Sequence, residues 1–574
     1  MKLKRFTATI ITFFVLIGIT SCGIPADSEL TNVHSSILRA DKSQPLIDNS
    51  DLYKNDVNTS VKTMYITTCP GVAENNTNHT WTEINTYSDV DYANMGVARY
   101  ENNILLQEGD EKGPYTGEGS LGAGLTENAT IRIRGQSSTR ATQKNYRISL
   151  TEEKWNDQKV INLYKSEADF LRFTNKLMYD LMKTIPNMVP MRTQFVHLYV
   201  KDAAAGSTSF VDYGFYTQIE QPNKRFLESH NLDKNGQLYK AQMFEFYRYN
   251  DAIRAKDDPN YSVEKFEEVL EIQGSDEHEK LIAMLEDLNN YDMDIKDVVE
   301  KWFNRDNLYT WVAFQILMGN IDSECHNFML YSPSDSNTFY MLNWDCDGAF
   351  VKEKQAYRDG EFDVGWQRGM ANFWGSVLYK RLLKDDDFRK EFNVVIKDVK
   401  DELLSDNSKK MIKDYAGVVR PYLYSGSDLQ HAKVNAETYD SMVETIPTWI
   451  EANYNNYLED LNRPMPFFIG EPIRQNNKTI LYWEGAHNFG GGSITYHVEM
   501  ADNFEFENKL LDDTIEAASD INVSYIYKDV LPEGDLYVKV TAVNEAGESR
   551  PAFDYVLSRD TGRSVRVYGC KKLQ

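Results

Sequence analysis

The sequence contains few cysteines and histidines, and only its N-terminal end carries a long apolar run. Five cysteines and nine histidines are spread over 574 residues, and they form no Cys-x-x-Cys pair and no His-rich zinc spacing. A chain of this length does not need a disulfide framework to build a core. A bridge between Cys325 and Cys346 is an open alternative, because both lie in the acidic segment described below. The composition therefore excludes a small disulfide scaffold and a structural zinc module.

Positive charge is also scarce. The chain has 62 Lys and Arg against 87 Asp and Glu, for a formal net charge of -25. Such a surface disfavours binding to nucleic acid or to an anionic membrane by bulk electrostatics, so we expect no nucleic-acid partner. A phosphate-binding site would have to be built locally, from a few well-placed Lys, Arg or backbone N–H groups.

The first 21 residues predict a lipoprotein signal peptide. Three basic residues precede an apolar run from Phe6 to Ile19, which is shorter than the roughly 20 residues of a membrane span. The run ends in small residues and Cys22, which resembles a bacterial lipobox and implies cleavage before Cys22 and a lipid on its sulfur. Cleavage would change the net charge from -25 to -28. An ordinary signal peptide is the alternative; we expect an extracytoplasmic protein, lipid-anchored to a bacterial membrane at Cys22.

The next segments predict a mixed α+β protein. Residues 22–60 are polar and aperiodic, which is typical of a linker. Helical periodicity predicts helices over 168–184, within 262–318 and through most of 371–461. Period-two alternation or β-rich composition predicts strands at Val61–Thr68, Val97–Leu106, Ala129–Arg134, Asn145–Leu150, Gln194–Val200 and Tyr213–Ile219.

The composition changes after residues 463–466, where helical periodicity gives way to short strands. Residues 466–560 resemble a fibronectin type III domain, with Trp483 as the early core tryptophan and Leu536–Asn544 as a late strand. The resemblance implies an all-β immunoglobulin-like sandwich, which commonly serves as a spacer or binding module. Residues 561–574 would then be a tail.

The segment 322–347, referred to below as the acidic constellation, contains the side chains most informative about a reaction. An apolar helix is predicted to end just before Asp322, and a strand hairpin over 328–342 separates Asn327 from Asp345 and Asp347. We expect Asp322, Asn327 and Asp345 to gather at one end of the hairpin. Crowded carboxylates favour a bound cation, and oxygen ligands favour Mg²⁺ or Mn²⁺. The alternative is that these residues only cap turns.

Calcium and zinc are less well supported by the same segment. An EF-hand starting at Asp345 would need a ligand where Ala349 stands and a glutamate where Ala356 stands. His326 lacks the nearby partners that a zinc set requires. The segment therefore predicts a magnesium-type site.

The order of the predicted elements is that of a protein-kinase domain, and residues 129–352 resemble the CotH kinase family, the spore coat protein H-like atypical kinases. One motif of this resemblance is Asn175-Lys176, which lies on the predicted helix. The remaining motifs are Arg134-Gly135-Gln136-Ser137-Ser138 with Lys144, Gly214 to Glu220, Asp322 with His326-Asn327-Phe328, and Trp344-Asp345-Cys346-Asp347. Gln136 stands where the family usually has Asn, and Lys144 is single where two lysines are common.

This resemblance implies a two-lobed kinase-like domain over 61–463, with a β-rich N-lobe and a helical C-lobe. It implies transfer of phosphate from ATP to Ser or Thr of a protein substrate at the cell surface, with Mg²⁺ or Mn²⁺. Asp322 would be the catalytic acid/base. The metal would be held by Asn327 and Asp345, with Asp347 as an alternate ligand; ATP would be contacted by Arg134, Ser137, Ser138 and Lys144, with Glu220 at a hinge-like strand end.

A different class of function remains open. ATP is scarce outside the cytoplasm, so the fold could serve as a catalytically inactive kinase-like surface scaffold or adhesin. Its ligand would be a cell-surface protein or carbohydrate. The 35 Tyr and nine Trp suit carbohydrate contact but equally fill cores.

Overall fold

The computed structural model describes residues 44–359, 366–475, 478–528, 531–532, 534–558 and 565–573. All of them belong to one compact unit, residues 39–574. The predicted signal peptide, Cys22 and the first half of the predicted linker lie outside the described residues. Within the described part, none of the helices has both the length and the apolar composition needed to cross a membrane.

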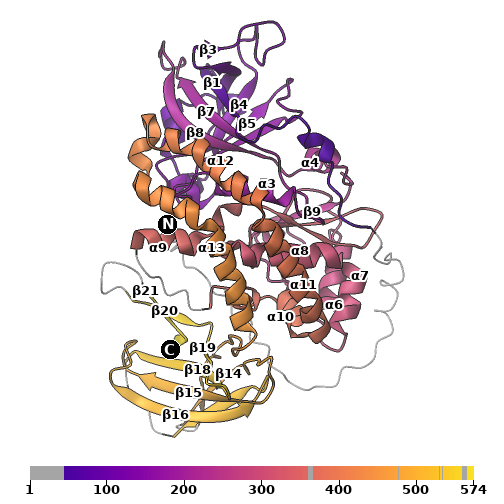
Figure 1. Ribbon diagram of the computed structural model, residues 1–574, viewed down its shortest axis with the longest axis vertical. Coiled ribbons are helices and arrows are strands. Elements are labelled where there is room, and N and C mark those ends of the chain that lie inside the picture. Colours follow the sequence, from indigo (N-terminus) through magenta and orange to yellow (C-terminus); the bar gives the residue numbers. More distant parts are fainter. Residues whose placement is uncertain are drawn as a thin grey trace. The chain divides into compact units, whose positions relative to one another are not determined.

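An eight-stranded sheet forms the N-terminal half (Figure 1). Its spatial order is β1-β7-β8-β6-β5-β4-β2-β3. The strands β4 and β5 have the predicted bounds, whereas β6 was not predicted. The strands are β1 (Val61–Cys69), β2 (Asn102–Asp110), β3 (Gly113–Pro114), β4 (Ala129–Arg134), β5 (Asn145–Leu150), β6 (Val160–Tyr164), β7 (Thr193–Lys201) and β8 (Val211–Glu220).

On β4 and β5, one face of the sheet is apolar and the other is more polar, as the alternation predicts. Ile131, Ile133, Tyr146 and Ile148 on β4 and β5 are buried in a core shared with α1 (Trp81–Thr86) and α2 (Asp89–Met95). The intervening residues point the other way. The second face is therefore free to line a site.

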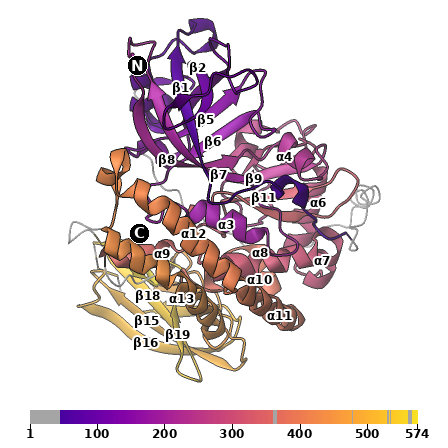
Figure 2. The same ribbon diagram turned by 45° about the horizontal axis from the view of Figure 1, so that its top comes forward.

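The helix predicted over 168–184 is shorter, α3 (Thr174–Met182). Arg172 has a left-handed backbone (φ 63°), which interrupts a right-handed helix. The Asp169 carboxylate accepts a hydrogen bond from the Thr174 N–H at 2.9 Å, so the first turn begins there. All of α3 is buried, and it packs against β7, β8 and α12 (Asp406–Leu423) (Figure 2).

A second sheet, of order β10-β9-β11-β12, lies in the middle of the chain. Its strands are β9 (Gln237–Ala241), β10 (Leu270–Ile272), β11 (Phe328–Ser332) and β12 (Tyr340–Asn343). The predicted hairpin over 328–342 is thus confirmed, with β9 added on its open side. The surrounding helices are α4 (Lys224–Ser229), α5 (Val263–Glu267), α6 (Glu279–Asn289), α7 (Ile295–Trp302), α8 (Arg305–Leu317), α9 (Val351–Asp359), α10 (Val377–Lys384), α11 (Asp386–Leu403) and α13 (Ala436–Asp460).

The C-terminal residues form short antiparallel strands around a separate apolar core that includes Trp483, Tyr496 and Val540. Cys570–Leu573 (β22), in the predicted tail, pairs with β18, so the β region extends beyond residue 560. The other strands are β13 (Ile473–Gln475), β14 (Lys478–Trp483), β15 (Ser493–Ala501), β16 (Lys509–Ala518), β17 (Val523–Tyr527), β18 (Leu536–Asn544), β19 (Ser549–Pro551), β20 (Tyr555–Ser558) and β21 (Val565–Tyr568).

Helix α13 connects this β region to the rest of the unit. Arg550 forms an ion pair with Asp460 at the end of α13, and both side chains are almost fully buried. The other Asp460 oxygen accepts a hydrogen bond from the Ala371 N–H at 3.1 Å. Seven residues earlier, the Asn453 side chain donates to the Leu317 carbonyl at the end of α8, at 3.1 Å.

Candidate active-site cavity

A cavity of about 790 Å³ opens between the two N-terminal sheets. The polar face of β4 and β5 and the loop between them line one side, and β9, β11 and the turn after β12 line the other. Seven of the predicted site residues meet here although the sequence separates them by up to 213 positions (from 134 to 347). They are Arg134, Ser137, Ser138, Asp322, Asn327, Asp345 and Asp347.

The turn that carries Asp322 lies directly against the turn that carries Asp347. Asp322 is in a short 3-10 turn, η5 (Ile321–Ser323), and a second one, η6 (Cys346–Gly348), follows β12. A Cβ placed on Gly348 would lie 2.7 Å from Asn320 Oδ1 and 3.1 Å from the Asp322 Cβ. Only a glycine lets the two turns approach this closely. The Asp322 side chain itself remains half exposed.

Helix α3 holds the second acidic turn from behind. The Asn175 side-chain carbonyl accepts a hydrogen bond from the Cys346 N–H at 2.8 Å, and its NH₂ group lies 3.5 Å from Asp345 Oδ1. Asp345 adopts a left-handed backbone (φ 46°), which Asp and Asn tolerate better than most residues. The buried amide of Asn175 therefore fixes a backbone that would otherwise be strained.

The carboxylates in this turn affect one another. Burial, and then the charge of Asp345, raise the pKa of Asp347 to about 7, and the Tyr164 hydroxyl donates a hydrogen bond to it. The nearest cation is Lys354, which donates to the Asp347 backbone carbonyl at 3.2 Å. The site thus concentrates negative charge that a cation would relieve.

The donor set fits a hard divalent ion. Asn327, with a left-handed backbone (φ 57°) just before β11, lines the same cavity as Asp345 and Asp347 and offers an amide oxygen. The carboxylates of Asp322, Asp345 and Asp347 do not form a cluster within 4.8 Å among the described residues. Mg²⁺ commonly takes one or two carboxylates and completes its shell with water and substrate phosphates, so one of these carboxylates together with the Asn327 amide has the chemistry that such an ion requires.

The loop between β4 and β5 covers the other side of the cavity. Gly135 has φ 94°, and a Cβ there would lie 2.0 Å from Ser138 Oγ, so the tight turn requires glycine. Ser137 and Ser138 follow in a 3-10 turn, η4 (Ser137–Arg140). The Arg134 guanidinium lies 5.3 Å from the centre of the Trp344 ring. Trp344 is the residue directly before Asp345 in the chain.

The structure does not bring Lys144 to the cavity lining. Its ammonium donates a hydrogen bond to the Thr139 carbonyl at 2.6 Å, and burial lowers its pKa. A second lysine, Lys165 at the exit of β6, does line the cavity. The sequence signal for this strand is the β-rich segment Val160–Tyr164, in which only Asn162 is polar.

Lys165 is paired with an acid 263 residues further along the chain. Its ammonium lies 2.8 Å from Asp428 Oδ1 and donates to the Tyr213 carbonyl at 2.8 Å. Burial lowers the pKa of Lys165 to about 8, although Asp428 opposes the shift. The Asp428 carboxylate also accepts from the Phe215 N–H at 2.6 Å, so this ion pair is built into β8.

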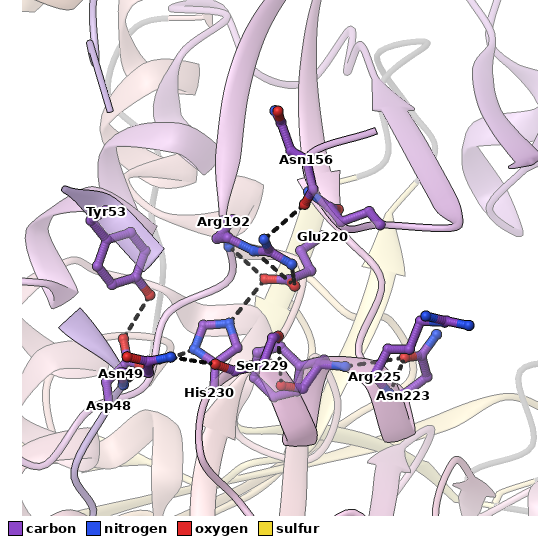
Figure 3. Close-up of polar contacts among 12 residues, drawn as sticks. Asp48, Asn49, Tyr53, Asn156, Arg192, Glu220, Asn223, Arg225, Ser229 and His230 are labelled. Atoms are coloured by element: carbon purple, nitrogen blue, oxygen red, sulfur yellow. Dashed lines mark hydrogen bonds and ion pairs between the residues drawn. The ribbon is translucent and has the colours of Figure 1, made fainter. Parts of the chain in front are cut away.

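Glu220 also lies outside the cavity lining, in a buried polar cluster (Figure 3). Its carboxylate accepts from Arg192 Nε at 3.0 Å and lies 3.0 Å from His230 Nε2. Burial would raise its pKa, but His230 and Arg192 lower it to about 2. Asp48, in the predicted linker, contacts the other His230 nitrogen at 2.5 Å, so this part of the linker packs against the folded unit.

The cysteines of the constellation are not bridged. Cys325 and Cys346 are both free thiols, so the alternative of a disulfide between the two acidic segments is wrong for this structure. Cys325 Sγ instead lies 3.3 Å from His326 Nδ1.

Comparisons with known proteins identify a family match over the part of the chain that carries the acidic residues of the cavity. A sequence model described as "CotH kinase protein" matches residues 131–457, which contain every residue of the acidic constellation. Among curated proteins, the inner spore coat protein H of Bacillus subtilis (strain 168) is 20% identical over 348 residues, covering 58% of this chain and 86% of that protein.

Two solved structures are similar over about half of the chain. One is the HipA–HipB complex with operator DNA from Shewanella oneidensis MR-1 (8% identity, TM-score 0.25, 52% of this chain and 59% of that chain). The other is the proinflammatory kinase CtkA of Helicobacter pylori (10% identity, TM-score 0.22, 55% and 94%). The family match, which spans more than half of the 574 residues, is the finding that identifies the chain: it belongs to the CotH kinase family.

Proposed function

We propose that this protein is an extracytoplasmic, lipid-anchored protein kinase that transfers phosphate from ATP to Ser or Thr of a protein. The observation that carries the proposal is the meeting of Asp322, Asn327 and Asp345 in one cavity with the β4–β5 loop. Kinases use an acid to orient the acceptor hydroxyl, and an amide and a second acid to hold the metal. Membership of the CotH kinase family supports this assignment.

Each side chain has a distinct task in the proposed reaction. Asn327 and Asp345 would hold Mg²⁺ (or Mn²⁺), which when bound neutralises charge on the ATP phosphates. The half-exposed Asp322 carboxylate orients the acceptor hydroxyl and takes its proton. The hydroxyl oxygen attacks the terminal phosphorus, the bond from that phosphorus to the bridging oxygen breaks, and ADP leaves.

The β4–β5 loop and its neighbours orient the nucleotide. Ser137 and Ser138 offer hydroxyl and backbone N–H donors, and Arg134 offers a planar guanidinium suited to phosphate. Lys165 reaches the same cavity from β6, so we assign to it the phosphate contact expected of Lys144 from the sequence.

Substitution of the two acids tests the reaction directly. Asp322→Asn and Asp345→Asn should each abolish transfer of label from ATP labelled in its terminal phosphate, while circular dichroism stays unchanged. Asp335→Asn is the matched control, because Asp335 is an exposed acid in the β11–β12 connection and does not line the cavity. Wild-type-like labelling by either active-site variant would refute the assignment.

The rival function, an inactive surface scaffold or adhesin, predicts a different response to nucleotide. A kinase site should raise the melting temperature in MgATP, since ligand at 100 times its dissociation constant stabilises the native state by about 2.7 kcal/mol. The Asp345→Asn variant should lose most of this shift. Unchanged melting of the wild type at millimolar MgATP would favour the scaffold.

We also propose that residues 466–573 form a fibronectin type III-like module that presents the catalytic unit or binds its target, and that Cys22 carries the lipid anchor. The buried core around Trp483 supports the first proposal. For the second, Cys22→Ser should lose incorporation of a labelled fatty acid in cells and move the protein from the membrane fraction to the soluble fraction. Retention of the label in this variant would contradict lipidation at Cys22.

A further inference from the structure

Three arginines share the polar face of β4 and β5. Arg132 and Arg147 are direct cross-strand partners, and Arg134 lies two residues further along β4. All three line the cavity. This is an unusual concentration of positive charge in a chain whose formal net charge is -25.

The arrangement is unfavourable without a ligand. Like charges directly opposite each other on neighbouring strands destabilise a sheet. Burial lowers the pKa of Arg147, and the charges of Arg132 and Arg134 lower it further. The fold therefore carries repulsion on this face that a bound anion would remove.

The carboxylates nearest to the arginines are already engaged. Glu271 receives Lys240 at 3.2 Å and the side chains of Gln242 and Gln273 at 2.8 and 2.6 Å. Glu101 lies 3.7 Å from Arg132. No ion pair within 4.0 Å joins the Arg134 or Arg147 guanidinium to a described carboxylate, and Glu271 and Glu101 only partly offset the lowered pKa of Arg147.

We propose that Arg132 and Arg147, next to the Arg134 already assigned to the nucleotide, form a second oxyanion site in the cavity, which binds a phosphoryl group independently of the metal ligands. Guanidinium groups pair with phosphate through two parallel hydrogen bonds, and their planar shape lets adjacent arginines share one anion. The site lies on the β4–β5 face, whereas Asn327 and Asp345 line the cavity from the β11–β12 side. This site does not require phosphotransfer, and it extends the proposed function by giving the same cavity two places for phosphate.

Titration of pyrophosphate in the absence of divalent metal tests the site. Wild-type protein should bind pyrophosphate, and Arg132→Gln and Arg147→Gln should each weaken binding at least tenfold. Both variants should melt at or above the wild-type temperature, because they remove repulsion; this shows that lost binding is not lost folding. Arg140→Gln, an exposed arginine in the same loop that does not line the cavity, should bind like wild type.

The phosphoryl group could belong to the nucleotide or to a phosphorylated acceptor, and the same variants separate the two. If the outer nucleotide phosphates reach the arginines, metal-free ATP should bind at least tenfold more weakly to Arg147→Gln than to wild type. AMP, which lacks these phosphates, should bind equally well to both proteins. If an acceptor phosphate occupies the site, a phosphoserine peptide loses affinity and ATP does not. Pyrophosphate binding that survives in both arginine variants, or is equally lost in Arg140→Gln, would overturn the proposal whether or not the protein transfers phosphate.

Discussion

The Asn175 side chain accepts a hydrogen bond from the Cys346 backbone N–H, 171 residues further along the chain. Asn175 belongs to a fully buried helix, α3, and Cys346 lies between the two acids of the cavity. A residue that contacts neither ligand nor solvent thus sets the backbone of the Asp345–Asp347 turn. We regard Asn175 as a positioning residue.

Replacing Asn175 with leucine should impair the turn more than the fold. The Cys346 N–H would lose its acceptor, at a cost of about 1–3 kcal/mol, and Asp345 would no longer be held. We expect at least tenfold slower phosphotransfer and a higher Mg²⁺ concentration for half-maximal rate. A stability loss with an unchanged Mg²⁺ requirement would show that Asn175 acts only in the core. Asn85→Leu, which also removes side-chain hydrogen bonds, here partly buried and away from the cavity lining, is the control.

Gly348→Ala should separate the two acidic turns. The new methyl would meet Asn320 Oδ1 at 2.7 Å and the Asp322 Cβ at 3.1 Å, so one turn must shift by a few tenths of an ångström or more. Since catalysis depends on alignment of reacting groups, we expect a drop in the rate constant of about tenfold with little change in nucleotide affinity. Gly375→Ala, where a methyl meets nothing within 4 Å, should leave the phosphotransfer rate unchanged. Equal rates in the two variants would contradict the claim that Gly348 is needed for the close approach of the two turns.

The two lysines should differ in their effects. Lys165→Met leaves the buried Asp428 carboxylate without its partner, which should cost about 3–5 kcal/mol of unfolding free energy, and it should abolish phosphotransfer. The double variant Lys165→Met/Asp428→Asn should recover most of the stability and none of the activity. Lys144→Met should retain activity; a greater loss there than in Lys165→Met would return the phosphate role to Lys144.

The cluster around Glu220 should make stability depend on pH. Burial disfavours a charged His230, but Glu220 and Asp48 outweigh it and raise the pKa of His230. A raised histidine pKa stabilises the fold below the unfolded value of about 6.5, and this contribution is lost as pH rises through the folded pKa. The unfolding free energy of wild type minus that of His230→Gln should therefore be largest near about pH 6 and shrink on the alkaline side.

Urea denaturation of both proteins across this range gives that difference. His79→Gln, a partly exposed histidine on the N-terminal half, should show no comparable trend. A difference that stays constant or grows with pH would contradict a charged His230 in the fold.

Local sequence patterns predicted the strands β4, β5 and the β11–β12 hairpin that line the cavity. The roles of Lys165 and Asn175 depend on long-range contacts and were not predicted. The alternation around Ile131 and Ile148 gave β4 and β5 their bounds, and the polar connections around Asp322 and Asp345 placed the acids at turn ends. Lys165 was missed because β6 is short and mostly buried and shows no clean alternation, since the buried polar residue Asn162 interrupts its apolar residues. The left-handed Arg172 and the role of Asn175 depend on partners far away in sequence, which periodicity cannot reveal.

Helix α13 contacts both the C-terminal β region and the end of α8, close to the turn that carries Asp322. The same helix binds Arg550 through Asp460 and the end of α8 through Asn453. These two points are seven residues apart, or about 10 Å along a helix, and α8 ends just before the turn that carries Asp322. A single stretch of α13 thus contacts both the C-terminal β region and the end of the helix that precedes Asp322, the residue assigned to the acceptor hydroxyl.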